Sequence, residues 1–489
     1  MLPTISYARA DGNTGASRSS PTGIIAVIGT SASGNVAKPT STTGKAQALA
    51  SFGHGDLAEY GAHIIDVGRK QVVLCKAVEA TPGSFGTLTT AGQPGSSPSV
   101  ITASAATKPV DRFRVVVQFT KAGTVGTAGI FWRASLDGGK TYGPETALGT
   151  ANTLVIPDTG ITLALAAGGI SAGETVTFKT RGPLTNLAGV QACLDALKTT
   201  GLTYEAILIG SLDAVATDIN GIRIAVDAFM QKGLSKRAFV NVRAWGDTGV
   251  ETAQAYIDAL TLISNASRTG LRVAVGADGG YIASPIRGIS MYRPTALFLA
   301  ARVARISIGT DAAAVADGPA DGVTITDDDG NPLCWDESAT PGLDDLGFVT
   351  LCRFARRAGA FIGNPRSFSP IGSDYVFDQQ ERCMEVAEER SYDFLLEEFS
   401  AKKRRDPVPG PQGQVYMLEA DVADIEQRGT LDLALVLRGE VTDVRLRLSR
   451  SEDFGSNAGG VLKPSIEIVS LIYIKGIAVT SRFVRSFTI

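Results

Sequence analysis

A glycine-rich turn follows the first strongly apolar stretch of the sequence, where nucleotide-binding proteins carry their phosphate loop. Residues 29–34 read Gly-Thr-Ser-Ala-Ser-Gly. A P-loop ends in Gly-Lys-Ser/Thr, because the lysine meets the phosphates and the hydroxyl holds Mg²⁺. Here Asn35 and Val36 follow the last glycine, and the glycines lack the spacing of a dinucleotide fingerprint. We interpret the segment as an ordinary tight turn and expect no nucleotide cofactor.

The sequence offers few groups for nucleophilic or metal catalysis. His54 and His63 are the only histidines, and both lie near glycines in apparent connector sequence. A serine or cysteine nucleophile would need one of them as its base. The chain has no HExxH pair and no His/Cys cluster with zinc-site spacing. Asp278 follows a predicted strand at the usual ligand-binding end of a parallel sheet, but it lacks a partner group, so we interpret it as a turn residue. We therefore predict no catalytic residue and no metal site.

Two acidic motifs predict turns rather than chemistry. Residues 135–142, Ser-Leu-Asp-Gly-Gly-Lys-Thr-Tyr, resemble the Asp-box hairpin of sialidase propellers, in which Asp and Ser brace a turn through hydrogen bonds. One copy predicts a hairpin and not a glycosidase. Residues 327–331, Asp-Asp-Asp-Gly-Asn, superficially suggest calcium, but an EF-hand loop requires a Glu at its twelfth position and flanking helices. The flanks are strand-like, so we predict an exposed hairpin turn.

A highly charged helix is predicted over residues 378–404, ended by a Pro-rich turn. Its acidic residues come first and its basic residues cluster at its end, an order that matches the helix dipole and indicates a solvated helix. The functional alternative is an electrostatic docking surface for another protein. The acidic candidates for that surface are Glu381, Glu385, Glu388 and Glu389.

Composition narrows the class of protein. The chain has 489 residues, enough for two to four domains, and a formal net charge of -3, which argues against nucleic acid as a partner. No segment approaches the length of a membrane span, and we expect no secretory signal and no insertion into a membrane. The five cysteines are scattered, so we expect reduced thiols in a protein that folds in a cytoplasm.

Hydrophobic patterning predicts a composite architecture: a parallel α/β core with an inserted β-sandwich domain and a β-rich C-terminal region ending in an exchanged strand. Within that region we expect strands at 431–437, 444–448 and 466–474, and before it a long apolar helix over 289–307. The predicted parts are an N-terminal arm at 1–22, a first part of the core at 23–84, the inserted domain at 85–185, the βαβ core at 186–345, an inner domain at 346–465 and linking strands at 466–489.

Both ends of the chain have a strand pattern. Near the C-terminus, the apolar residues share one side of a two-residue period, which requires a sheet partner or leaves an exposed edge. A short strand-like run near the N-terminus is followed by a flexible tether. Either these ends join sheets of other copies, or both pair within their own domain. The candidate linking residues are Ile5, Tyr7, Ile477, Val479, Phe483, Phe487 and Ile489.

The order of these segments resembles that of the contractile-tail sheath proteins of bacteriophages, a family related to bacteriocin and injection-system sheaths. The resemblance lies in residues 23–34, in 52–60 with its Phe-Gly step, and in 281–285 before an Ala-rich helix. It covers most of the chain as pattern, and it is weakest over 81–185, the predicted outer surface.

The resemblance implies a structural subunit without catalytic centre or cofactor. Such subunits polymerise around a tail tube by strand exchange and contract from a metastable extended state to drive the tube through the host envelope. It implies partners that are other copies, the tube protein, and baseplate and tail terminator proteins, in a virion tail assembled in the host cytoplasm. The charged helix would face the tube. An α/β enzyme with an unfamiliar site and a non-contractile tail or baseplate component remain alternatives.

Overall fold

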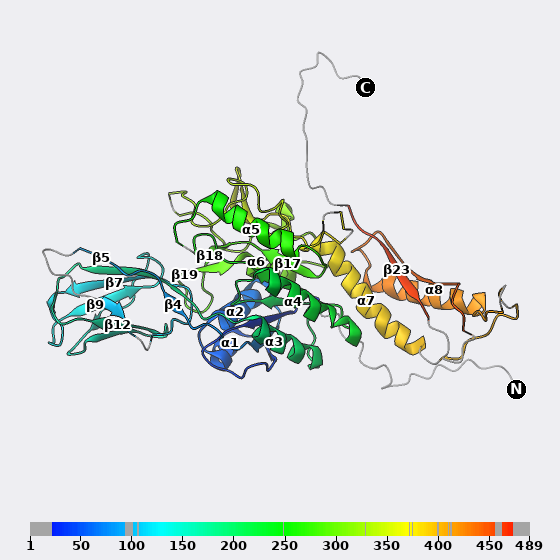
Figure 1. The fold of residues 1–489 in the computed structure, drawn as a ribbon, viewed down its shortest axis with the longest axis horizontal. Helices are drawn as coiled ribbons and strands as arrows, with labels where there is room; N and C mark the ends of the chain where they lie inside the picture. The colour runs from blue at the N-terminus through cyan, green and yellow to red at the C-terminus, as the bar shows by residue number, and fades with distance from the viewer. Residues whose placement is uncertain are drawn as a thin grey trace, which may run out of the picture. The chain divides into compact units, whose positions relative to one another are not determined.

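A six-stranded, mostly parallel sheet lies at the centre of the first of two structural units (Figure 1). The first unit comprises residues up to Ile308 and Ala312–Glu381, and the second comprises Gly309–Asp311 and the chain from Arg382. The structure is a computed structural model that describes residues 22–472 apart from 93–100, 105–106, 248, 328, 371, 374, 399–400, 409, 411–412 and 455–461.

The strand order of the central sheet is β17-β16-β15-β1-β3-β2, and only the edge pair β2–β3 is antiparallel. Strand β1 is apolar throughout and buried on both faces, as parallel sheets covered by helices require. Without β2, the chain order across the sheet is 2-1-3-4-5, which is the flavodoxin-like order. The bounds are β1 Ile25–Gly29, β2 Thr40–Thr42, β3 Val72–Lys76, β15 Ala206–Ile209, β16 Arg237–Asn241 and β17 Val273–Gly276.

Helices cover both faces of this sheet. Ile25 and Val27 of β1 pack with α1, α2 and α6, whereas Ala26 and Ile28 pack with α3, α4 and α5. This alternation gives the first unit its two main cores and confirms the predicted α/β architecture of this part. The bounds are α1 Lys45–Phe52, α2 Asp56–Gly68, α3 Leu187–Thr199, α4 Ala216–Asp227, α5 Ala253–Ser267 and α6 Thr295–Arg305, with 3-10 turns η1 Met230–Lys232 and η2 Val315–Asp317.

The chain between β3 and α3 forms an insert of antiparallel strands. Its larger sheet has the order β10-β9-β7-β14-β4, with β5 also paired to β14, and a second sheet has the order β11-β12-β6. Side chains of both sheets, such as Val115, Val117 and Leu163, enter one hydrophobic core. The bounds are β4 Ser84–Phe85, β5 Thr89–Ala91, β6 Ile101–Ala103, β7 Arg114–Lys121, β8 Gly123–Thr124, β9 Phe131–Ser135, β10 Thr146–Ala147, β11 Thr153–Ile156, β12 Ile161–Leu165, β13 Gly169–Ile170 and β14 Thr175–Arg181.

The predicted Asp-box turn is confirmed in the insert. The Ser135 hydroxyl donates to Asp137 at 2.7 Å and accepts the Gly139 N–H at 2.8 Å. Asp137 also accepts the backbone N–H and the hydroxyl of Thr141, at 2.9 and 2.6 Å. Both carboxylate oxygens of Asp137 therefore accept hydrogen bonds within the turn that follows β9.

The insert joins the core through a short neck, which we define as residues 77–83 and 181–185. Thr81 and Leu184 exchange backbone hydrogen bonds across it, at 3.0 and 2.9 Å. Because the neck leaves from the end of β3, the insert is anchored at the carboxyl edge of the central sheet.

Two antiparallel ribbons complete the first unit. The first pairs β18 Gly279–Ala283 with β19 Ser290–Pro294, and the second pairs β20 Leu351–Phe354 with β21 Arg357–Ile362. Helix α6 begins directly after β19, so the predicted helix over 289–307 is wrong in its first third. The alternating burial of β19 shows why, since Met291 and Arg293 turn inward while their neighbours do not.

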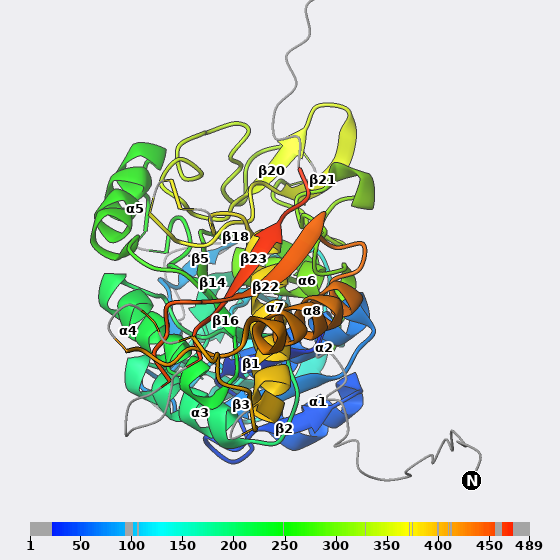
Figure 2. The same cartoon turned by 90° about the vertical axis from the view of Figure 1, so that its right-hand side faces the viewer.

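In its described residues, the second unit contains most of helix α7, helix α8 and a two-stranded ribbon. Figure 2 shows β22 Asp443–Leu448 and β23 Pro464–Val469 beside α8 Glu419–Val436. Val422 and Ile425 of α8 pack with Leu448 of β22. Gly429 permits this approach, since a Cβ there would lie 2.3 Å from the Leu446 side chain. Helix α7 Asp378–Glu398 begins in the first unit and continues into the second.

Two predictions about this region are wrong. The segment 431–437 is the end of α8 and not a strand, because its buried residues continue the helical spacing of Val422, Ile425, Gly429 and Leu433. The charged helix ends at Glu398, so the basic residues at 402–405 lie beyond it, where Lys403 forms an ion pair with Glu398. The strands expected near 444–448 and 466–474 are present as β22 and β23.

Within the described ranges, no helix has the length and apolar character needed to cross a membrane. The candidate linking residues Ile5, Tyr7, Ile477, Val479, Phe483, Phe487 and Ile489 lie outside the described residues.

Candidate functional site

The place to look for a ligand site is the carboxyl edge of the central sheet between β1 and β15. In a sheet of this order, the helices change face at that point, and the diverging loops form a crevice that commonly binds ligands. Thr30 follows β1 and Ser211 follows β15 at this edge. Ser211 has a φ of +53°, a left-handed conformation that is uncommon for residues other than glycine.

The neck of the insert fills this crevice. The Thr30 hydroxyl donates to the Pro183 carbonyl at 2.9 Å, and the Thr30 N–H donates to the Ser211 hydroxyl at 3.1 Å. Arg181, Gly182 and Leu184 line what remains, a cavity of about 50 Å³. That volume suits a few water molecules, whereas small-molecule sites are typically about 300–1,000 Å³. The usual ligand position of this fold is therefore occupied by the chain itself.

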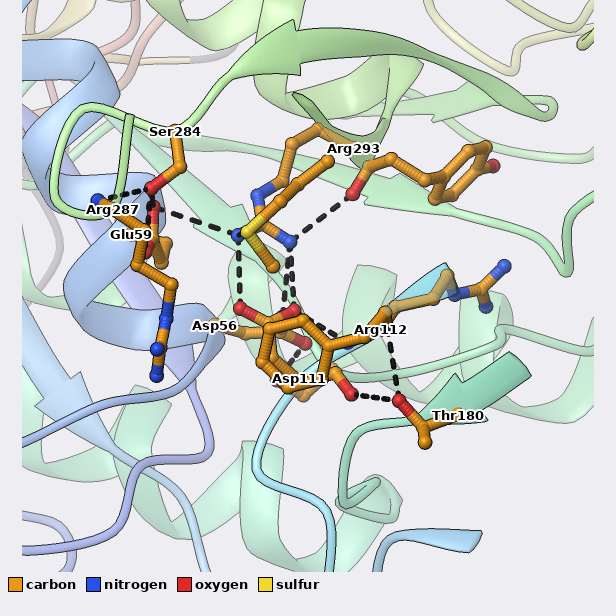
Figure 3. A network of polar contacts seen from close by, with 12 residues as sticks. Asp56, Glu59, Asp111, Arg112, Thr180, Ser284, Arg287 and Arg293 are labelled. Carbon is orange, nitrogen blue, oxygen red and sulfur yellow. Dashed lines mark hydrogen bonds and ion pairs between the residues drawn. The ribbon is translucent and has the colours of Figure 1, made fainter. Parts of the chain in front are cut away.

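A buried ionic network lies beside the crevice (Figure 3). Arg293 of β19 donates to both carboxylate oxygens of Asp111, at 2.8 and 2.9 Å. It also lies 3.5 Å from Glu59 and 3.9 Å from Asp56, both on α2. Arg293, Asp111 and Glu59 are each only 1% exposed. One buried guanidinium thus faces three carboxylates, and these four residues come from three separate parts of the sequence.

The charges of this network are balanced imperfectly. Burial, followed by the negative charge of Asp111, raises the pKa of Asp56 to about 7 against the opposing charge of Arg293. Burial likewise raises the pKa of Glu59, again opposed by Arg293. Burial acts to lower the pKa of Arg293, but the carboxylates of Asp111 and Glu59 outweigh it and raise that pKa well above its usual value. Arg293 stays charged, and its single positive charge is shared among the three carboxylates.

The network joins the insert to the core. Asp111 and Arg112 lie just before β7. The Thr180 hydroxyl joins this segment to β14, because it accepts the Phe113 N–H and donates to the Asp111 carbonyl. Arg112 forms a bidentate pair with Asp247, at 2.8 and 3.0 Å, and its guanidinium lies 4.6 Å from the Tyr292 ring centre. These contacts fix the base of the insert against the loop after β16 and the β18–β19 ribbon.

The serine hydroxyl groups of the network donate hydrogen bonds to its carboxylates. Ser284 donates to Glu59 at 2.8 Å, and Ser211 donates to Asp56 at 2.9 Å. In the described part of the chain, neither His54 nor His63 is hydrogen-bonded to a hydroxyl or thiol group. His63 packs edge-on against Phe298 in the core, and burial lowers its pKa to about 4. The arrangement therefore has the character of a structural joint.

The other residues singled out in the sequence also have structural surroundings. Asp278 is buried and accepts hydrogen bonds from the Tyr292 hydroxyl and the Trp335 N–H, at 2.9 and 2.5 Å. Burial raises its pKa to about 6. Asp327 accepts the backbone N–H of Asn331 at 2.7 Å, which confirms the predicted hairpin turn. Among the residues that the structure describes, no three His, Cys, Asp or Glu side chains are arranged so that they could hold a metal ion.

The four candidate tube-facing residues divide into two pairs. Glu381 and Glu385 are each 4% exposed, so they are not part of an exposed docking surface. Glu381 accepts hydrogen bonds from the Arg272 N–H at 2.5 Å and from the Ser367 hydroxyl, and burial raises its pKa to about 7. Glu388 and Glu389 are partly exposed. The docking prediction therefore narrows to this second pair.

The comparison with solved structures finds sheath proteins among its matches. The helical sheath of the anti-feeding prophage in its contracted state matches with a TM-score of 0.49 and 10% identity, over 99% of each chain. The sheath tail protein of Desulfitobacterium hafniense matches with a TM-score of 0.47 and 9% identity, over 96% of this chain and 100% of that chain. The sheath tail protein of Listeria innocua matches with a TM-score of 0.43 and 11% identity, over 93% and 96% of the two chains.

No curated protein matches the sequence. Residues 2–366 match the family described as DUF2586, N-terminal domain. Because this match spans most of the sequence, the chain belongs to the DUF2586 family.

Proposed function

We propose that this protein is the structural subunit of a contractile tail sheath, which polymerises by strand exchange around a tail tube. In this proposal, the sheath assembles in an extended, metastable state and contracts to drive the tube through the host envelope. The partners are other copies of the chain, the tube protein, and baseplate and tail terminator proteins. The protein would be located in the tail of the assembled virion. The inserted domain, which we interpret as a β-sandwich, lies on the outer surface.

The observation that carries the proposal is the isolated ribbon β22–β23. Among the described residues, this sheet has only two strands. The Leu446 and Leu448 N–H groups of β22 donate to Thr430 and Glu426 of α8, so within the described chain the outer edge of β23 is the one left without a partner strand or covering helix. A two-stranded sheet is marginally stable by itself, and open edges accept strands from other chains. Shortly after β23, the sequence continues with the alternating apolar residues Ile477, Val479, Phe483, Phe487 and Ile489. Main-chain pairing of such a segment with the ribbon of a neighbouring copy would link subunits into a polymer.

The filled crevice supports a role without catalysis. An α/β enzyme of this sheet order would keep the crevice between β1 and β15 open for its substrate. Here the neck and the Arg293 network occupy that place, and the remaining cavity of about 50 Å³ holds water at most. We infer that the protein is not an enzyme.

Truncation tests the linkage. A variant lacking residues 478–489 should fold, as judged by circular dichroism and size-exclusion chromatography, but should remain monomeric. The full chain should form long hollow cylinders under negative-stain electron microscopy. Cylinders formed by the truncated protein would contradict the linkage assignment.

A matched pair of substitutions tests the register of the exchanged strand. Val479→Asp places a charge on the apolar side of the two-residue period, whereas Thr480→Asp places the same charge on the other side. We expect Val479→Asp to abolish polymerisation and Thr480→Asp to preserve it. Equal behaviour of the two variants would argue against a half-buried terminal strand.

The tube-facing surface is a separate proposal that rests on Glu388 and Glu389. Reversing both charges to lysine should impair assembly on the tube, because an electrostatic docking surface would then repel its partner. The control is Asp195→Lys on α3, an exposed acidic residue of the first unit. Normal extended tails from the double variant would remove this proposal and leave the strand-exchange proposal intact.

A further inference from the structure

A wider cleft lies beside the filled crevice, between the insert and the β18–β19 ribbon. Its volume is about 550 Å³, and its walls come from β4, β7 and β14 on one side and from β18, β19 and the segment after β16 on the other. Small-molecule sites typically enclose about 300–1,000 Å³, so this space can hold a ligand or a side chain of another protein.

Two cations stand directly opposite each other on the insert wall. Arg114 of β7 and Lys179 of β14 are paired residues in the antiparallel register. Val115 and Val117 of β7 enter the core of the insert, so Arg114 lies on the other face of the sheet, as Lys179 does. Like charges directly opposite each other destabilise an antiparallel pair. The sheet therefore tolerates an unfavourable contact at this position.

The carboxylates near the cleft are already engaged elsewhere. Asp247 pairs with Arg112 through two hydrogen bonds and lies 3.5 Å from Arg181. Asp278 is buried and accepts the Tyr292 hydroxyl. Among the described residues, neither Arg114 nor Lys179 forms an ion pair. The positive charge of this cross-strand pair is thus left for a ligand to balance.

Arg114 is held in a fixed position, whereas Lys179 is exposed. The Arg114 guanidinium stacks 4.4 Å from the centre of the Tyr281 ring and donates to the Asp137 carbonyl at 3.0 Å. A guanidinium fixed in this way is preorganised, so it loses little side-chain entropy when it binds an anion. Trp245, Tyr281 and Tyr292 line the opposite wall and provide apolar contact surface.

We propose that this cleft binds an oxyanion, a carboxylate or phosphate group, between Arg114 and Lys179. The group can come from two sources: a free small anion, or an acidic side chain of a second copy of this chain. Both present the same chemistry to the two cations. The phosphate experiment requires no polymer, so its result is independent of the proposed sheath function.

Titration with inorganic phosphate, at constant ionic strength set by chloride, tests the free-anion source. By calorimetry we expect saturable binding of phosphate to the full chain. The affinity should be about fivefold weaker in Lys179→Gln, because this variant loses one exposed lysine–phosphate ion pair. The control is Lys121→Gln, an exposed lysine at the other end of β7 that does not line the cleft. It should bind phosphate as the unaltered protein does.

Sedimentation of the same chain tests the second source. If phosphate does not bind, Lys179→Glu should reduce self-association while Lys121→Glu leaves it unchanged, with both variants folded by circular dichroism. The proposal is overturned if phosphate binding is absent or equal in the protein and Lys179→Gln, and self-association is also insensitive to Lys179→Glu.

Discussion

Replacing Arg293 by methionine is the sharpest test of the buried network. Methionine keeps much of the side-chain volume but removes the guanidinium that faces Asp56, Glu59 and Asp111. Breaking a buried ion pair by removing one partner costs about 3–5 kcal/mol, because the remaining charge is buried without compensation. Domains are stable by about 5–15 kcal/mol, so the loss should be a large fraction of the total.

Arg305→Met provides the matched control. Arg305 pairs with Asp321 at 3.0 Å in the same unit, but the two side chains are 50% and 45% exposed. An exposed pair of this kind contributes about 0–1 kcal/mol. The comparison therefore separates the effect of burial from the chemistry of an arginine–aspartate pair.

Urea unfolding monitored by tryptophan fluorescence measures both variants. All three tryptophans of the chain lie in the first unit, Trp132 in the core of the insert and Trp245 and Trp335 near the central sheet. At pH 8, Arg293→Met should lose several times more stability than Arg305→Met. The loss should shrink at pH 5, because carboxyl groups without a cation take up protons more readily. Equal losses for the two variants would refute the view that the network holds the insert on the core.

Three further predictions concern single contacts. The pKa of Asp56 is about 7 in the folded chain and about 4 in the unfolded chain, so the free energy of unfolding falls as pH rises from 4 to 7. In Asp56→Asn, urea unfolding should show a free energy that varies less over this interval and is higher at pH 8 than in the unaltered protein. Asp137→Ala should destabilise the insert by about 1–3 kcal/mol, because the Thr141 donors lose their acceptor; unchanged Trp132 fluorescence unfolding would contradict this. Gly429→Ala should speed hydrogen exchange along α8, because the added Cβ would overlap the β22 side chains; mass spectrometry showing native protection would contradict it.

The sequence predicted regular elements where apolar periodicity was strong. Strands β17, β22 and β23 lie where the pattern indicated: β17 before Asp278 is buried throughout, and apolar residues alternate along β22. The prediction failed for α8, where closely spaced leucines satisfy a two-residue period as well as a helical one. The surrounding positions Val422, Ile425 and Gly429 carried the helical signal.

The buried network could not be predicted from the sequence. Its members Asp56, Glu59, Asp111 and Arg293 come from α2, the neck side of β7, and β19, and no local spacing relates them. A weak signal was present in α2, where Glu59 stands among apolar residues that the helix buries on several sides. A charge in such a position requires a partner, but only the fold identifies Arg293 as that partner.

The connectivity explains why a flavodoxin-like strand order carries a joint here and not a ligand. The insert leaves from the end of β3 and returns to the start of α3, so its neck must cross the carboxyl edge of the sheet. There it meets Thr30 and Ser211, the positions that would otherwise border the crevice. Opening that crevice would require moving Pro183 and separating Asp111 from Arg293, at a cost of about 3–5 kcal/mol for the ion pair alone. A force applied to the insert would pass through the same contacts into α2 and β19. The edge that binds substrates in enzymes of this topology is thus filled by the joint between the insert and the core.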